Sequence, residues 1–350
     1  MAEPPDSPSQ RDPSRPQESG DRHGTRESPP EPVDMGPLSA DTGENESTTT
    51  VLIALGVNLL IALAKSAAAF LSHSASMMAE AAHSWADTGN EVLLLVADKR
   101  AHKGPDETHP LGYGREGYVW ALFAGMGLFV AGSVVSFFRG IKELMQPEPG
   151  GDYLISYIVL AIALIFETIS FVRSARQARP EARTMDRDLI EHVLQTSDPT
   201  LRAVFFEDAA AITGVVIAGL GLFLHQLTGN PVYDAIGSLL IGTVLAATAY
   251  VLVDRNRAFL LGEQADPSIR EATIASLLEM PEIERVTFLR LSIVGPRQIF
   301  VVGDVDLAGD ERETRVAETL RHLEARLRES AAVVDAVLSL SVQDEESITR

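Results

Sequence analysis

Six apolar runs, each about 18 residues or longer, most constrain what this chain can fold into. They cover roughly residues 51–71, 77–97, 117–138, 153–173, 202–225 and 233–253. A run of this length can cross the hydrocarbon core of a bilayer as one helix, and six in succession are rare in soluble domains. The sequence therefore predicts an all-α bundle of six transmembrane helices over residues 51–254, rather than a soluble bundle of buried helices.

Basic residues are concentrated in alternate loops between these runs. The loop after the second run, the loop after the fourth run and the segment after the sixth run are rich in Lys and Arg, whereas residues 72–76 and 226–232 contain neither. Because Lys and Arg accumulate on the cytoplasmic side, we expect both termini to be cytoplasmic. As a separate expectation, we assign the chain to the plasma membrane. Arg139 and Lys142 are exceptions that we expect to extend the third helix into the interface.

The segments outside the apolar runs are polar. Residues 1–50 are rich in Pro, Ser, Asp and Glu without apolar periodicity, which predicts a disordered acidic tail and no signal peptide. The net charge of −20 argues against nucleic-acid binding, and the absence of Cys excludes disulfides and thiolate metal sites.

Residues 255–350 show the pattern of a small separate domain. A helical pattern at 268–279 is followed by two strand patterns, RVTFLRLSIVG and QIFVVGDVDLA, then by the amphipathic helix ETRVAETLRHLEARLRE and the alternating strand AVLSLSV. The sequence predicts an α+β domain of order αββαβ. Its only His, His322, is flanked by charge on the amphipathic helix, so we expect it to be solvated and place no metal in this domain.

The second apolar run contains ionisable residues at a depth where such residues are rare. His83 and Asp87 are four residues apart and share one helix face at membrane depth, where ionisable groups usually face a cavity or a partner. An imidazole nitrogen and a carboxylate oxygen suit Zn²⁺ and related divalent metals, and Asp208 in the fifth run could complete such a site. A buried polar network that only fixes helix packing is the alternative, and on these residues alone both remain open.

Several separated motifs carry a family resemblance. NLLIALAKSAAAFLSHSASMMAEAAHSWADTGNEVLLL is followed by HPLGYGREGYVWAL, EDAAAITG, DAIGSLLIG and LLGE, in this order. From about residue 51 onward the chain resembles the cation diffusion facilitator family of metal/proton antiporters, and the EDAAA form resembles the subgroup of the mitochondrial zinc transporters of animals. The resemblance implies a cytoplasmic, ferredoxin-like or metallochaperone-like C-terminal domain that forms a homodimer.

The resemblance also implies a ligand set. In the family, a His or Asp followed four residues later by Asp occurs on the second span and again on the fifth. His83 and Asp87 match the first pair and Asp208 matches the last position, but Val204 occupies the remaining one and cannot ligate. We expect Glu207 to substitute as ligand or proton carrier, or a water to take its place. One nitrogen with two or three carboxylates suits Zn²⁺ and also admits Mn²⁺, Fe²⁺ or Co²⁺.

The function expected from this resemblance is secondary transport. The chain would export a divalent metal, most often Zn²⁺, from the cytoplasm in exchange for protons, with the metal and protons as substrates and no cofactor. A membrane metalloenzyme is a weaker alternative, because the sequence has no HExxH and no nucleophile motif. A metal sensor that binds without transport is the other alternative.

Overall fold

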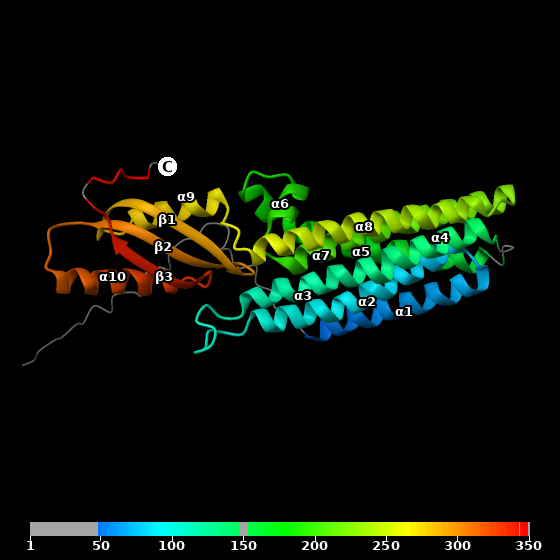
Figure 1. Ribbon diagram of the computed structural model, residues 1–350, viewed down its shortest axis with the longest axis horizontal. Coiled ribbons are helices and arrows are strands. Elements are labelled where there is room, and N and C mark those ends of the chain that lie inside the picture. The colour runs from blue at the N-terminus through cyan, green and yellow to red at the C-terminus, as the bar shows by residue number, and fades with distance from the viewer. Residues whose placement is uncertain (1–47, 148–150, 152, 343, 349–350) are drawn as a thin grey trace, which may run out of the picture. The chain divides into compact units, whose positions relative to one another are not determined.

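The computed structural model describes residues 48–147, 151, 153–342 and 344–348. Six long helical segments make up the bundle, and Figure 1 shows them lying side by side. They are α1 (Thr48–Ser72), α2 (Ala75–Ala101), the continuous segment α3–η2–α4 (Gly114–Met145), α5 (Tyr153–Thr184), α7 (Pro199–Thr228) and α8 (Val232–Leu260). The predicted six-helix bundle is confirmed. The predicted disordered tail lies outside the described residues, except that residues 48–50 begin α1.

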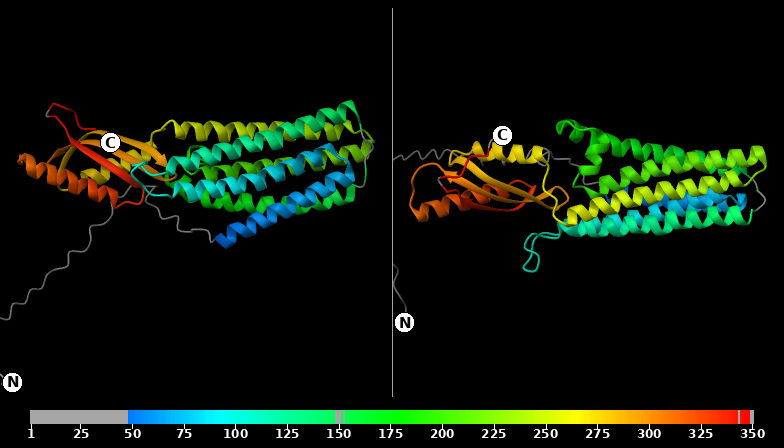
Figure 2. Two further views of the ribbon diagram at one scale, coloured as in Figure 1. Left: turned by 60° about the horizontal axis from the view of Figure 1, so that its bottom comes forward. Right: turned by 45° about the horizontal axis from the view of Figure 1, so that its top comes forward.

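Five of these six segments are long and apolar enough to cross a membrane, within the part of the chain that the structure describes. The exception is α2, which has 27 residues and therefore a length of about 40 Å. It falls short because it carries the buried polar residues Glu80, His83 and Asn90 in addition to Asp87. α2 contacts α1, α3, α7 and α8, so its polar groups meet other helices rather than lipid. Figure 2 shows the same group of long helices from two further directions.

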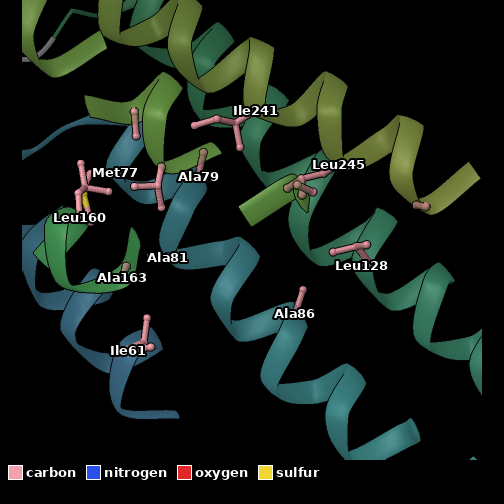
Figure 3. Close-up of a cluster of buried hydrophobic side chains, with 14 of the residues drawn as sticks. Ile61, Met77, Ala79, Ala81, Ala86, Leu128, Leu160, Ala163, Ile241 and Leu245 are labelled. Carbon is pink, nitrogen blue, oxygen red and sulfur yellow. The ribbon is translucent and has the colours of Figure 1, made fainter. Parts of the chain in front are cut away.

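Small residues on α2 allow its neighbours to approach closely. Alanines at 79, 81 and 86 are almost fully buried. Figure 3 shows them among larger apolar side chains from other helices, including Ile61 of α1, Leu160 of α5 and Leu245 of α8. These buried side chains pack closely around α2 and so hold its polar residues in place.

The third span contains a π-helical segment that the sequence did not predict. η2 (Leu128–Val134) joins α3 (Gly114–Gly127) to α4 (Val135–Met145). Gly132 lies so close to α8 that an added Cβ would come within 2.9 Å of Leu245. The Ser133 hydroxyl donates a 2.8 Å hydrogen bond to the carbonyl of Gly242 on α8. The wider π turn therefore coincides with a close approach between the third span and α8.

One carboxylate joins the beginnings of α2 and α8. Asp234, in the first turn of α8, is almost fully buried. It accepts hydrogen bonds from the hydroxyl of Ser74 (2.8 Å), the backbone N–H groups of Ala75 (2.6 Å) and Ser76 (3.4 Å), and the hydroxyl of Ser76. A carboxylate is favourable there because the first N–H groups of a helix have no intrahelical partner and carry positive partial charge.

Turn chemistry determines where α7 begins and where the chain bends before α3. Asp198 caps α7 by accepting from the N–H groups of Thr200 and Leu201, with Pro199 at the first helical position. Gly112, in the bend before α3, has a φ of 72°, which few other residues adopt. The segment between α5 and α7 was predicted as a loop, but it includes the last turns of α5 and a short helix, α6 (Leu189–Gln195).

The loop before α3 is held by an acidic residue. Hydrogen bonds from Thr108, Tyr113 and Lys103 keep the pKa of the exposed Asp106 carboxyl well below its usual range. The stabilised form is the ionised one, so this arrangement persists from neutral pH down through the ordinary titration range of Asp.

The C-terminal domain has the predicted αββαβ order. Its elements are α9 (Pro267–Leu278), β1 (Ile283–Gly295), β2 (Gln298–Leu307), α10 (Glu313–Arg328) and β3 (Val333–Leu340). β1 pairs with β2 antiparallel and β2 pairs with β3 parallel, giving the strand order β1-β2-β3. Val301 and Val305 of β2 are fully buried, as the alternating pattern predicts, together with Leu323 of α10. His322 is exposed on α10.

Candidate metal-transport site

The predicted pair on α2 is formed. The Nδ1 atom of His83 lies 3.2 Å from Oδ1 of Asp87, and the His83 side chain is fully buried while that of Asp87 is 18% exposed. The Nδ1 atom of His83 and the Oδ1 atom of Asp87 face each other, whereas the buried Nε2 atom of His83 has no hydrogen-bond partner among the described residues. Because a buried polar atom without a partner costs about 1–3 kcal/mol, this pair does not serve packing well, and it fits a site that is completed by a cation.

Asp208 belongs to the same polar region. It lies on α7, which packs against both α2 and α5. The Ser170 side chain of α5 hydrogen-bonds to it, and its carboxylate interacts electrostatically with Asp87 and His83. Its Oδ2 atom is buried and has no hydrogen-bond partner within the described chain. The bundle thus brings a third predicted ligand close to the pair.

Glu207, the expected substitute ligand, hydrogen-bonds to α2. Its Oε1 atom accepts a 3.0 Å hydrogen bond from the side-chain amide of Asn90 on α2, and the residue is 8% exposed. It also interacts electrostatically with Asp87 and Asp208. Glu207 is therefore near the site but already engaged, and its assignment as a ligand stays a prediction.

The ligating side chains do not converge to binding distance in this structure. In the residues that the structure describes, no group of three or more His, Asp or Glu side chains has the geometry to hold a metal ion. His83 and Asp87 meet, whereas Asp208 and Glu207 approach them from α7. Val204, at the fourth position of the family pattern, is a half-buried apolar residue.

A buried ion pair next to the site was not predicted. Lys65 of α1 donates to Oε2 of Glu80 on α2 at 2.9 Å, and both side chains are fully buried. Glu80 therefore links α2 to α1 through Lys65. The signal in the sequence was a Lys at membrane depth, which requires a carboxylate partner.

Glycine makes room for this ion pair. Gly214 of α7 faces the carboxylate of Glu80 so closely that a Cβ at this position would collide with Oε1. A second polar link, from the Asn58 amide of α1 to Glu91 at 3.1 Å, joins the same two helices as the Lys65–Glu80 pair. These contacts fix α1, α2 and α7 around the site.

Known proteins resemble this chain over the same region. The family profile described as "Cation efflux transmembrane domain" matches residues 51–261. The mitochondrial proton-coupled zinc antiporter SLC30A9 of Xenopus laevis is 32% identical over 259 residues, which are 74% of this chain and 46% of that protein. Metal tolerance protein C4 of Arabidopsis thaliana is 29% identical over 77% of this chain and 59% of that protein. Zinc transporter ZitB of Escherichia coli is 22% identical over 75% and 79%.

The chain spans about half the length of the zinc antiporters that it matches. The matched region is nevertheless the whole helical bundle that carries the polar site, from α1 through α8. The family profile alone covers more than half of the 350 residues. The chain is therefore a multi-pass membrane protein that belongs to the cation efflux, or cation diffusion facilitator, family.

Proposed function

We propose that this protein exports a divalent metal cation from the cytoplasm in exchange for protons, and that Zn²⁺ is its main substrate. The observation that carries the proposal is the His83–Asp87 pair at 3.2 Å, in which the buried Nε2 atom of His83 lacks a hydrogen-bond partner in the described chain. Asp208 approaches this pair from α7. The names of its relatives, a proton-coupled zinc antiporter and a zinc transporter, support the same substrate class.

Exchange follows from competition for the same atoms. An imidazole nitrogen or a carboxylate oxygen binds either a proton or a metal ion, so metal binding requires that protons leave. If the site is exposed to one side of the membrane at a time, protons arriving from outside displace the metal outward. Glu207, hydrogen-bonded to Asn90 and electrostatically linked to Asp87 and Asp208, is placed to take part as a proton carrier.

The location and assembly of the protein are part of the proposal. The alternate basic loops support cytoplasmic termini, and the C-terminal domain is the proposed surface for homodimer formation. The plasma membrane stays a prediction, because the SLC30A9 relatives are named as mitochondrial proteins.

The test is metal flux into proteoliposomes that contain the purified full chain and a Zn²⁺ indicator. We expect Zn²⁺ uptake that increases with an opposing proton gradient and is lost in Asp87→Asn. The matched control is Asp98→Asn, because Asp98 forms the same kind of four-residue His–Asp pair with His102 on α2, at 3.3 Å, but is exposed.

Three results would decide between the possibilities. Wild-type flux in Asp87→Asn would remove the site assignment. Metal binding without flux in the wild-type protein would indicate a sensor. Flux without a response to the proton gradient would remove the antiport mechanism and leave the metal site in place.

A further inference from the structure

The metal site has an unfilled ligand position on α7. Val204 stands one turn before Asp208, where the family pattern has a ligating residue, and it offers no ligating atom. Glu207 is hydrogen-bonded to Asn90 of α2. Any replacement ligand must come from a helix that packs beside Asp208. α5 is such a helix, because it contacts both α7 and α1.

Glu167 is on the inward face of α5. Leu160, Ala163 and Ser174 are buried and lie at helical spacing on either side of it, while its neighbours Phe166 and Ile169 are exposed in the way that lipid-facing residues are. An acidic residue on the inner face of an otherwise apolar span is costly unless it has a partner or a function.

The same face of α5 touches the site. Ser170, one turn after Glu167, hydrogen-bonds to Asp208. Glu167 itself interacts electrostatically with Lys65, Asp87 and His83, and also with Asp208. Its carboxylate is therefore among the charged groups of the site, although it comes from a helix to which the family pattern assigns no ligand.

The groups that interact electrostatically with Glu167 include atoms that still require partners. The His83 side chain is fully buried, its Nδ1 atom lies 3.2 Å from Oδ1 of Asp87, and its Nε2 atom has no hydrogen-bond partner among the described residues. The Oδ2 atom of Asp208 is likewise buried without a partner within the described chain. Lys65 does not satisfy them, since its ammonium group donates to Glu80 at 2.9 Å and these atoms have no hydrogen-bond partner in the part of the chain that is described. A divalent cation between His83, Asp87, Asp208 and Glu167 would satisfy these atoms together.

We propose that Glu167 is the fourth ligand of the transported metal and takes the place that Val204 leaves open. This inference rests on the proposed function and names a residue within the same site. Since no three ligating side chains converge in the described structure, the Glu167 and Asp208 carboxylates turn toward the His83–Asp87 pair when the ion enters. The resulting set has one nitrogen and three carboxylates, so it favours oxygen-preferring metals such as Mn²⁺ more than a set with two nitrogens does.

The first test compares metal affinities by isothermal titration of the detergent-solubilised full chain with ZnCl₂ and with MnCl₂. In Glu167→Gln we expect both affinities to fall by about tenfold or more, and Mn²⁺ to lose more than Zn²⁺ because it depends more on carboxylate oxygen. The control is Glu181→Gln, the same change about four turns further along α5, at a carboxylate that binds Arg297 and can do so as an amide. It should leave both affinities unchanged.

The second test does not require the Gln variant to fold. The chain contains no Cys, so Glu167→Cys introduces a single thiol, and a thiolate is a good Zn²⁺ ligand. We expect Zn²⁺ to protect this thiol from N-ethylmaleimide. Thr168→Cys, on the exposed side of α5, should react at the same rate with and without Zn²⁺.

The outcomes separate this inference from the proposed function. Only the role of Glu167 would be overturned if the wild-type protein transports Zn²⁺ but the metal affinity of Glu167→Gln stays within about twofold of wild type. An unprotected thiol at position 167 in a transporting protein would have the same meaning. A wild-type protein that neither binds nor transports Zn²⁺ would overturn both. A loss of affinity for Zn²⁺ and Mn²⁺ in equal proportion, without thiol protection, would indicate a packing role and also overturn it.

Discussion

Replacing Lys65 by Met should destabilise the bundle strongly, because the replacement leaves the Glu80 carboxylate buried without its cation. The Lys65 Nζ and Glu80 Oε2 atoms are 2.9 Å apart and both side chains are fully buried. At that distance, with an effective dielectric constant of about 20, the attraction is about 6 kcal/mol. Desolvation of both ions offsets much of it. Removal of one partner of such a pair costs about 3–5 kcal/mol, and we expect a value in this range.

The double variant Lys65→Met/Glu80→Gln separates loss of the pair from loss of packing. With no charge left at either position, it should recover most of the stability that Lys65→Met loses. The measurement is the free energy of unfolding in mixed micelles for the wild-type protein, the two single variants and the double variant. The reasoning is refuted if Lys65→Met costs less than about 1 kcal/mol, or if the effects of the two single changes simply add.

Two further substitutions test how the bundle is fixed around the site. Gly214→Ala places a Cβ against Oε1 of Glu80 and should lower the free energy of unfolding by about 1–3 kcal/mol, whereas Gly219→Ala on the same helix meets open space and should not lower it; equal effects in the two variants would contradict the predicted collision. Asp234→Ala leaves the first N–H groups of α2 buried without their acceptor and should lower the free energy of unfolding by about 2 kcal/mol or more. Hydrogen exchange at the start of α2 should be faster in this variant than in the control Asp254→Ala, and unchanged exchange at the start of α2 would show that the cap is dispensable.

The fold could be predicted from local patterns because apolar length and strand alternation are properties of single segments. The six spans and the αββαβ domain were predicted from these patterns, and the His83–Asp87 contact was predicted because a spacing of four places two side chains on one helix face. Even α2, which is too polar for a simple hydropathy criterion, was found from its flanking apolar residues.

Contacts between helices could not be predicted in the same way, because they depend on how the helices rotate against each other. The sequence offered Lys65 several carboxylates, and only the packing of α1 on α2 selects Glu80. Likewise the bond from Asn90 to Glu207 depends on the contact between α2 and α7. The π turn at Leu128–Val134 coincides with the close approach of the third span to α8, and that contact between helices is not visible within the segment itself.

The carboxylate of Asp234 has a consequence for movement. Its four hydrogen bonds tie the first turn of α8 to the first turn of α2, and α2 carries His83 and Asp87. Separating the two helices at this end would break all four bonds in a buried place where water cannot replace them. α2 and α8 therefore share a pivot at their beginnings, and the displacement that a rotation about it produces grows with distance along α2, so it is larger at Asp87 than at the cap itself.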